Sequence, residues 1–290
     1  DIFEQFLQKQ QLGGKRKIPV TLGVHQARAY LRSRKQQGLN VGMVFLDLCE
    51  AFYRIVREMA MGGITSDETI ARMCQRLQLG PDTMRELYQH LDKASAIERA
   101  GMPKHLQMVV QAIHSDTHFH LPGQLDHCRT RLGTRPGDCW ADFIFSFLWA
   151  RLLHELEAEL KPLDILDSIP QHGGFRCDGI AADPEDFELP GRDDYLGPTW
   201  MDDSCFCFAA ADPWTLERKA ANLCGLLIQR CQSYAMTPNL QPGKTAALLI
   251  FQGHGAAAAR KKFFGPQSDS SLPVLLEGGV QRVQVVASYV

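Results

Sequence analysis

Two short apolar segments of the chain carry aspartate at positions where a buried strand tolerates charge poorly. Residues 41–48 form a nearly continuous apolar run, typical of a buried strand, and Asp47 interrupts it. Residues 199–208 predict a β-hairpin with the adjacent aspartates Asp202 and Asp203 at its tip. An unpaired carboxylate in such surroundings costs several kcal/mol, and neighbouring carboxylates repel one another unless a cation neutralises them. The fold must therefore give these three side chains either solvent or a shared cation.

Carboxylates that meet at strand ends form a hard-oxygen site suited to Mg²⁺, and Mn²⁺ can take its place. Two such ions about 4 Å apart can promote an in-line displacement at phosphorus, because one activates the attacking hydroxyl and the other stabilises the leaving pyrophosphate. The simpler alternative is an ordinary solvated Asp-Asp turn with Asp47 as a polar strand end. The three aspartates alone leave both interpretations open.

The remaining pattern predicts a mixture of helices and strands. Helical spacing of apolar residues occurs at residues 21–36, 51–60, 67–78, 82–98, 103–114, 138–160 and 213–234. Further strands are predicted at residues 117–121, 128–132, 245–251 and 280–287. Residues 161–198 are rich in proline, glycine and aspartate and predict an irregular insertion. This order indicates an α+β layer fold.

The net charge of −2 alone argues against a nucleic-acid-binding protein, since such domains are usually basic. The negative charge is local, however. Residues 176–203 contain nine acidic residues and two arginines, a net charge of −7, which leaves +5 for the rest of the chain. A mildly basic body with one acidic stretch is compatible with nucleic-acid binding, so the whole-chain value excludes nothing.

The sequence contains no apolar stretch of about 20 residues that would span a membrane, and no segment resembles a signal peptide. Its nine cysteines are scattered without a C-x-x-C pair, which favours free thiols in a reducing, intracellular setting, nucleus or cytoplasm. The chain begins with Asp1 and ends in a β-prone segment. We therefore expect it to be part of a longer protein with further domains.

Four sequence blocks in order resemble the palm motifs of reverse transcriptases. Phe45-Leu-Asp-Leu-Cys-Glu-Ala-Phe52 is similar to the first motif, hydrophobic-x-Asp-x-x-x-Ala-Phe/Tyr, and Trp200-Met-Asp-Asp203 to the x-x-Asp-Asp signature. Asn239-Leu-Gln-Pro-Gly-Lys-Thr245 resembles the Asn-x-x-Lys-Thr of the fourth motif, with one extra residue. Upstream, Gln11-Leu-Gly-Gly-Lys-Arg-Lys17 is similar to the Gln-x-Gly-Phe-Arg block of non-LTR (LINE-type) retroelement enzymes.

The second motif departs from the family. Leu132-Gly-Thr-Arg-Pro-Gly-Asp-Cys-Trp-Ala-Asp-Phe-Ile-Phe145 resembles Gly-x-x-Gln-Gly-x-x-x-Ser-Pro-x-x-Phe, but Pro136 replaces the usual glutamine. Ala141 and Asp142 replace Ser-Pro. Because that glutamine lies near the incoming nucleotide in the family, these departures put catalysis in doubt.

The resemblance implies a polymerase palm, an antiparallel sheet backed by helices, with partial fingers and no thumb. Residues 1–40 would form the partial fingers and the entry to the palm, and residues 41–290 the palm. A helical insertion at 64–114 and an acidic loop insertion at 161–198 would interrupt it. The triphosphate-gripping part of the fingers would precede Asp1, and the thumb would follow Val290.

The same resemblance assigns catalytic roles. Asp47, Asp202 and Asp203 would hold two Mg²⁺ ions, with the backbone carbonyl of Leu48 as a further ligand. Lys244 would be the general acid for pyrophosphate, although a solvated turn lysine is an equally simple interpretation.

Substrate-binding roles follow in the same way. Phe52 would be the steric gate against a ribose 2′-hydroxyl, unless it is a core residue of the helix after the strand. Gly137 would let the backbone approach the nucleotide, and Arg135 would contact phosphate or simply lie on the surface. Basic residues would line the template–primer channel by binding phosphates: Lys15, Arg16, Lys17, Arg129 and Arg131.

The expected function is RNA-directed DNA polymerisation, the addition of dNTPs to the 3′-hydroxyl of a DNA or RNA primer on an RNA template. One alternative is a degenerate relative that binds nucleic acid without polymerising, and another is an unrelated Mg²⁺ nuclease that uses the same carboxylates.

Overall fold

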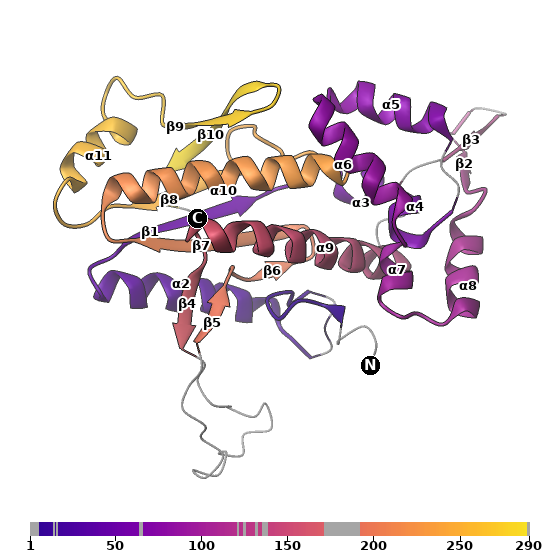
Figure 1. The fold of residues 1–290 in the computed structure, drawn as a ribbon, viewed down its shortest axis with the longest axis horizontal. Coiled ribbons are helices and arrows are strands. Elements are labelled where there is room, and N and C mark those ends of the chain that lie inside the picture. The colour runs from indigo at the N-terminus through magenta and orange to yellow at the C-terminus, as the bar shows by residue number, and fades with distance from the viewer. Residues whose placement is uncertain are drawn as a thin grey trace, which may run out of the picture.

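The computed structural model describes residues 6–13, 15, 17–63, 66–120, 122–123, 126–130, 133–134, 139–170 and 192–288. Its centre is a six-stranded mixed sheet with the strand order β6-β7-β1-β8-β10-β9 (Figure 1). The strands are β1 (Asn40–Leu46), β6 (Thr199–Trp200), β7 (Asp203–Ala210), β8 (Ala246–Ile250), β9 (Ser271–Leu276) and β10 (Gly279–Val286). The predicted α+β class is confirmed.

Strand β1 lies in the middle of the sheet, as its apolar run requires. It pairs antiparallel with β7, from Asn40 opposite Ala210 to Leu46 opposite Ser204. On its other side it pairs antiparallel with β8, from Val41 opposite Ile250 to Phe45 opposite Ala246. A strand with neighbours on both sides and both faces covered must be apolar almost throughout, so the polar side chains flank the apolar run, Asn40 at its start and Asp47 where the pairing ends.

The two faces of the sheet pack against different helices. Phe206 and Phe208 belong to the main core, which includes residues of α9 (Cys139–Leu160) and α10 (Pro213–Ser233). Cys205 and Cys207 point to the opposite face and pack with Tyr30 of α2 (Val20–Gln36). Figure 1 shows α9 and α10 crossing one face of the sheet, with α2 alongside the other. Successive side chains of β7 therefore point to opposite faces of the sheet, and both faces are buried.

Two predicted helices are shorter than their apolar spacing suggests. Residues 51–60 form α3 (Ala51–Arg54) and α4 (Arg57–Met61), because Ile55 and Val56 between them are extended and fully buried. Residues 82–98 likewise divide into α6 (Pro81–Asp92) and α7 (Ala96–Arg99). Burial of Ile55 and Val56 in the core outweighs the continuation of the first helix. Between α6 and α7, Lys93 and Ala94 are exposed, and Ser95 starts a new helix because its side chain accepts a hydrogen bond from the Glu98 N–H.

The predicted helical insertion at 64–114 also contains α5 (Asp67–Leu77) and α8 (Lys104–His114), which contribute Ile70 and Val110 to the main core. A hairpin of β2 (His118–His120) and β3 (His127–Arg129) follows it. The predicted strand pair around Pro122 is confirmed, with shorter strands. Helix α6 begins without a local side-chain cap. Instead, Glu277, from the turn between β9 and β10, accepts hydrogen bonds from the backbone N–H groups of Asp82 and Thr83.

The prediction of an irregular insertion at 161–198 is wrong at both ends. A 3₁₀ turn (Lys161–Leu163) is followed by strand β4 (Asp167–Pro170), which pairs antiparallel with β5 (Arg192–Tyr195). Most of the acidic residues between β4 and β5 lie outside the described residues. Asp167 ties the base of this hairpin to α2, since it accepts bonds from Arg34 Nε at 2.7 Å and from the Tyr30 hydroxyl at 2.6 Å.

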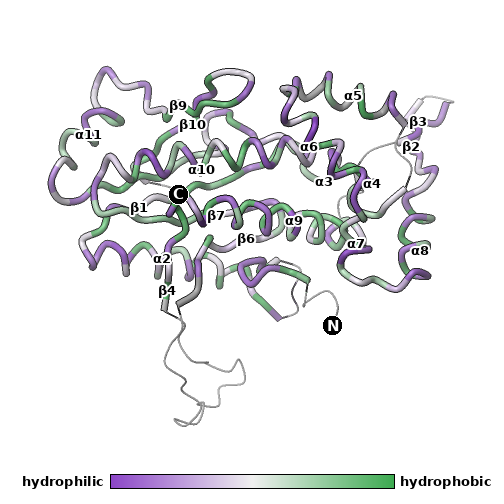
Figure 2. Tube along the Cα trace, in the orientation of Figure 1, coloured by the Kyte–Doolittle hydropathy of each residue, from purple (hydrophilic) through white to green (hydrophobic). Residues whose placement is uncertain are grey.

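Two elements near the C-terminus were not predicted: α11 (Ala256–Phe264), whose first turn is a run of alanines, and strand β9. In Figure 2, green and purple alternate along α10, as expected of a helix with one buried side. No helix in the described part of the chain is both long and apolar enough to cross a membrane.

Candidate functional site

The backbone of Asp47 is fixed at the end of β1 by the segment that resembles the fourth motif. The Asn239 N–H donates to the Asp47 carbonyl at 2.8 Å. The Thr245 hydroxyl donates to the same carbonyl at 3.1 Å and accepts from the Asp47 N–H, also at 3.1 Å. Asn239 and Thr245 therefore fix the backbone of Asp47 at the end of β1, a role that the sequence did not predict for either residue.

Asp202 and Asp203 lie where β6 turns into β7. Trp200 pairs with Asp203, so Asp203 is the first residue of β7 and the turn itself consists of Met201 and Asp202. The prediction that both aspartates form the tip is therefore wrong by one residue. Met201 has a φ of 53°, a left-handed conformation that is uncommon for a residue with a side chain. Such strained backbone is concentrated at functional sites, where surrounding contacts maintain it.

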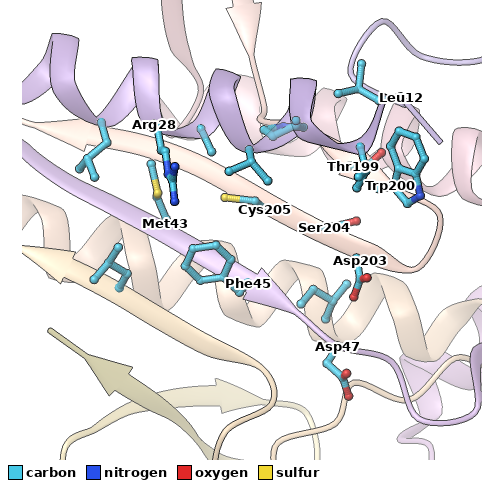
Figure 3. Close-up of a pocket in the computed structure, with 18 of the residues that line it drawn as sticks. Leu12, Arg28, Met43, Phe45, Asp47, Thr199, Trp200, Asp203, Ser204 and Cys205 are labelled. Atoms are coloured by element: carbon cyan, nitrogen blue, oxygen red, sulfur yellow. The ribbon is translucent and has the colours of Figure 1, made fainter. Parts of the chain in front are cut away.

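The register of the sheet brings the carboxylates together. Leu46 is opposite Ser204, so Asp47 and Asp203 continue two neighbouring strands at the same edge of the sheet. Figure 3 shows both side chains at one end of a shared cavity. Lys244 joins them from the segment before β8, with its Nζ 3.6 Å from Asp47 Oδ1.

The electrostatics of the three aspartates are coupled. The pKa of Asp202 is raised, first by burial and then by the charges of Asp203, Asp47 and Asp142. The pKa of Asp203 is also raised, by partial loss of water around its carboxyl and by the charge of Asp47, while the Lys244 ammonium opposes this rise. The charge of Asp47 thus contributes to the raised pKa of both Asp202 and Asp203, and an added cation would relieve this repulsion.

A cavity of about 690 Å³ opens beside these carboxylates. It runs between α2, which contributes Val24 and Arg28, and the sheet, which contributes Phe45 and Cys205 (Figure 3). Asp47, Asp203 and Lys244 form its polar end. An apolar cleft with a few convergent charged groups at one end is typical of a ligand-binding site.

The donor chemistry of this end fits Mg²⁺, which prefers carboxylate and carbonyl oxygens. The backbone carbonyl of Leu48 is a suitable further ligand. Leu48 faces Pro238 in an antiparallel bridge whose hydrogen bonds are made by the neighbouring residues, so the Leu48 carbonyl points away from that segment. Among the described residues, however, no three His, Cys, Asp or Glu side chains are close enough to enclose an ion. Binding would therefore require the aspartate side chains to turn toward one another.

The other predicted site residues have different surroundings, and some lie outside the described part of the chain. Phe52 packs against Phe145 of α9, with ring centroids 5.2 Å apart, and is partly buried against the core. Lys15 Nζ donates to the Gln8 carbonyl at 3.0 Å, Lys17 is exposed, and Arg129 forms an ion pair with Asp116 at 2.7 Å. Arg16, Arg131, Arg135 and Gly137 lie outside the described residues. Of the predicted site residues, Asp47, Asp203 and Lys244 therefore line the cavity together.

Asp142, which the sequence marks only as a departure from the second motif, is a neighbour of the site. It lies in the first turn of α9 and its charge contributes to the raised pKa of Asp202. The available signal was its position in the second motif, where an acidic residue replaces the proline of the family.

Comparisons with known proteins leave this geometry as the basis for a functional assignment. No protein-family model matches the chain, and no curated protein matches it.

Proposed function

We propose that this chain is the palm-centred part of an RNA-directed DNA polymerase of the non-LTR retroelement type, which adds dNTPs to a primer 3′-hydroxyl on an RNA template. The observation that carries the proposal is the convergence of Asp47 and Asp203 on adjacent strands, with Lys244 3.6 Å from Asp47. The motif resemblance assigns catalytic roles to the same residues.

The architecture supports the same proposal. Strands β7 and β1 bring Asp203 and Asp47 to one end of the sheet, and helices α9 and α10 cover the opposite face from α2. The palm resemblance implies an antiparallel sheet backed by helices. Strands β6, β7, β1 and β8 fit this arrangement, but β10 pairs with β8 in parallel, so the sheet as a whole is mixed and that part of the expectation is wrong. Many unrelated proteins share α+β layers, so the argument for function depends on the site rather than on the fold.

In this proposal the chain's own groups act at defined points of the reaction. Asp47, Asp202, Asp203 and the Leu48 carbonyl would hold two Mg²⁺ ions, which supply charge neutralisation and Lewis-acid activation when bound. The primer 3′-hydroxyl attacks the α-phosphorus of a dNTP, a new P–O bond forms, and the bond to pyrophosphate breaks. Lys244 donates a proton to the departing pyrophosphate, and Phe52 excludes a ribose 2′-hydroxyl.

The natural partners would be an RNA template, a DNA or RNA primer, dNTPs and further domains of the same protein. An intracellular location belongs to the same proposal. It is supported by the free thiols of the described cysteines, which include the fully buried Cys231.

Primer extension on a primed RNA template tests this function. The chain, together with any sequence that naturally flanks it, should incorporate dNTPs with Mg²⁺, and Asp202→Ala should abolish incorporation. Absence of incorporation, or activity unchanged by Asp202→Ala, would contradict the proposal.

A second candidate, a nucleic-acid-binding relative that does not polymerise, is favoured by one observation. Asp142 adds a negative charge beside Asp202 at a position where the family has proline. This candidate predicts salt-sensitive binding of an RNA–DNA hybrid without dNTP incorporation at any Mg²⁺ or Mn²⁺ concentration.

A further inference from the structure

We propose that residues 10–13 are a positioning segment that holds the Asp202–Asp203 turn in the geometry needed for a divalent cation. This inference rests on the proposed function only in assuming that the aspartates bind such a cation. The segment precedes the turn by almost 190 residues in the sequence. Its backbone nevertheless bonds to β6, its glycine lies against Met201 of the turn, and its buried amide side chain bonds to α9.

The backbone of the segment extends the sheet beyond β6. Gln11 forms a parallel bridge with Thr199. The Leu12 N–H donates to the Thr199 carbonyl at 2.9 Å, and the Thr199 N–H donates to the Gln10 carbonyl at 2.9 Å. Strand β6 contains only Thr199 and Trp200, so without this segment its outer edge would be unpaired immediately before the turn. The segment therefore fixes the strand that leads into Met201 and Asp202.

Gly13 allows the segment to approach the turn closely. A Cβ atom added to Gly13 would lie 2.6 Å from the backbone nitrogen of Met201, 3.2 Å from Met201 Cγ and 3.2 Å from the carbonyl carbon of Trp200. Two of these three atoms are backbone, so the conflict could not be relieved by a change of rotamer alone. Any side chain at position 13 must therefore displace the turn or the segment.

The Gln11 side chain connects the segment to the helix beneath the turn. Gln11 is buried, and its Nε2 donates to the Ser146 carbonyl of α9 at 3.1 Å. The Ser146 hydroxyl in turn lies 3.6 Å from the sulfur of Met201. Met201 is thus enclosed by the segment on one side and by α9 on another, which explains how its left-handed backbone conformation is maintained.

These contacts converge on one turn, and the turn carries Asp202 and the start of the strand that carries Asp203. A displacement of Met201 by a few tenths of an ångström would be passed directly to both carboxylates, since they are the next two residues. The positioning segment should therefore control the affinity of the aspartates for a cation while the core between the sheet and α10 remains intact.

The test measures Mn²⁺ binding to the full chain by electron paramagnetic resonance, which needs no activity. We expect Gly13→Ala to weaken Mn²⁺ binding about tenfold. The matched control is Gly278→Ala, because a Cβ at Gly278 meets nothing within 4 Å, and it should bind as the wild type does. Asp203→Asn defines the signal that remains when the site is lost.

A second variant guards against misfolding of Gly13→Ala. Gln11→Met keeps the volume of the buried side chain but removes its bond to Ser146, and it should also weaken Mn²⁺ binding. Amide hydrogen exchange should increase at residues 199–203 in this variant while exchange in α10 stays as in the wild type. A uniform increase along the chain would indicate general destabilisation and would overturn the inference.

The outcomes separate this inference from the proposed function. Weaker Mn²⁺ binding in both segment variants supports the positioning role even if the protein incorporates no dNTPs. Folded segment variants with wild-type affinity would overturn it, whatever the polymerase assay gives. A wild-type protein that binds no more Mn²⁺ than Asp203→Asn would overturn both.

Discussion

Lys244 Nζ lies 3.6 Å from Asp47 Oδ1, at the place where β1 ends and β8 begins. The two residues are almost 200 positions apart in the sequence, and the antiparallel pairing of their strands brings them together. The ammonium of Lys244 also opposes the rise in the pKa of Asp203. The Lys244 ammonium therefore interacts electrostatically with carboxylates on two neighbouring strands.

If the Lys244 ammonium donates a proton to pyrophosphate, Lys244→Met should reduce the rate of dNTP incorporation about 100-fold. This factor is at the lower end of the range for general acid catalysis. The effect should fall on kcat rather than on the KM for primer–template. Lys244→Arg retains the charge and serves as the control, with an intermediate rate. Steady-state primer extension measures both constants, and equal rates for the methionine variant and the wild type would exclude this role.

The raised pKa of Asp202 predicts a specific pH dependence of stability. A carboxyl group whose pKa is higher in the folded protein than in the unfolded chain favours folding when it is protonated. The free energy of unfolding that Asp202 contributes should therefore decrease as the pH rises from about 4 through its raised pKa.

Asp202→Asn removes this penalty, so it should raise Tm at pH 7 by about 1–2 °C without added metal. The difference from the wild type should disappear near pH 3, where the wild-type carboxyl is protonated in both states. Thermal melts followed by circular dichroism between pH 3 and pH 8 provide the comparison. A lower Tm for the asparagine variant at pH 7 would show that the ionised Asp202 carboxylate does not destabilise the folded protein.

Phe52 combines a packing contact with its proposed role against ribonucleotides. Because its ring is partly buried against Phe145, Phe52→Ala should lower the free energy of unfolding by about 2 kcal/mol, less than for a fully buried phenylalanine. The same variant should increase rNTP incorporation relative to dNTP incorporation. Loss of stability with an unchanged rNTP-to-dNTP ratio would assign Phe52 to the core alone.

The ion pair between Arg34 and Asp167 should be important for the hairpin of β4 and β5. Both side chains are largely buried, at 7% and 20% exposure, and their atoms are 2.7 Å apart. Arg34→Leu leaves the carboxylate without its main partner and should cost about 3 kcal/mol in chemical denaturation. The double variant Arg34→Leu/Asp167→Leu should recover much of this loss, and a double variant no more stable than the single one would contradict the explanation.

The sequence predicted those parts of the fold in which local pattern and tertiary environment agree. The apolar run of β1 and the alternation of Phe206 and Cys207 in β7 follow directly from burial on both faces. Helix α10 begins after Asp212, as predicted, because the Asp212 carboxylate accepts the N–H groups of Trp214 and Thr215.

Other features of the fold depend on contacts between residues far apart in the sequence, and the sequence did not predict them. Ile55 and Val56 have helical spacing, but they are extended because both side chains are buried in the core. Helix α6 depends on Glu277, about 195 residues away, for its N-terminal cap. Asp47 and Asp203 could be selected from the sequence, whereas the closeness of Gly13 to Met201 could not, since a glycine in a polar loop has many explanations.

The most direct measurement of the central claim is dNTP incorporation on a primed RNA template by this chain, together with any sequence that naturally flanks it, compared with its Asp203→Asn variant. The account predicts Mg²⁺-dependent incorporation by the wild type and a decrease of at least about 1,000-fold in the variant, which should retain the fold but lose one carboxylate of the proposed metal site. Equal incorporation by the two proteins, or none by a wild type that binds RNA–DNA hybrid, would contradict it.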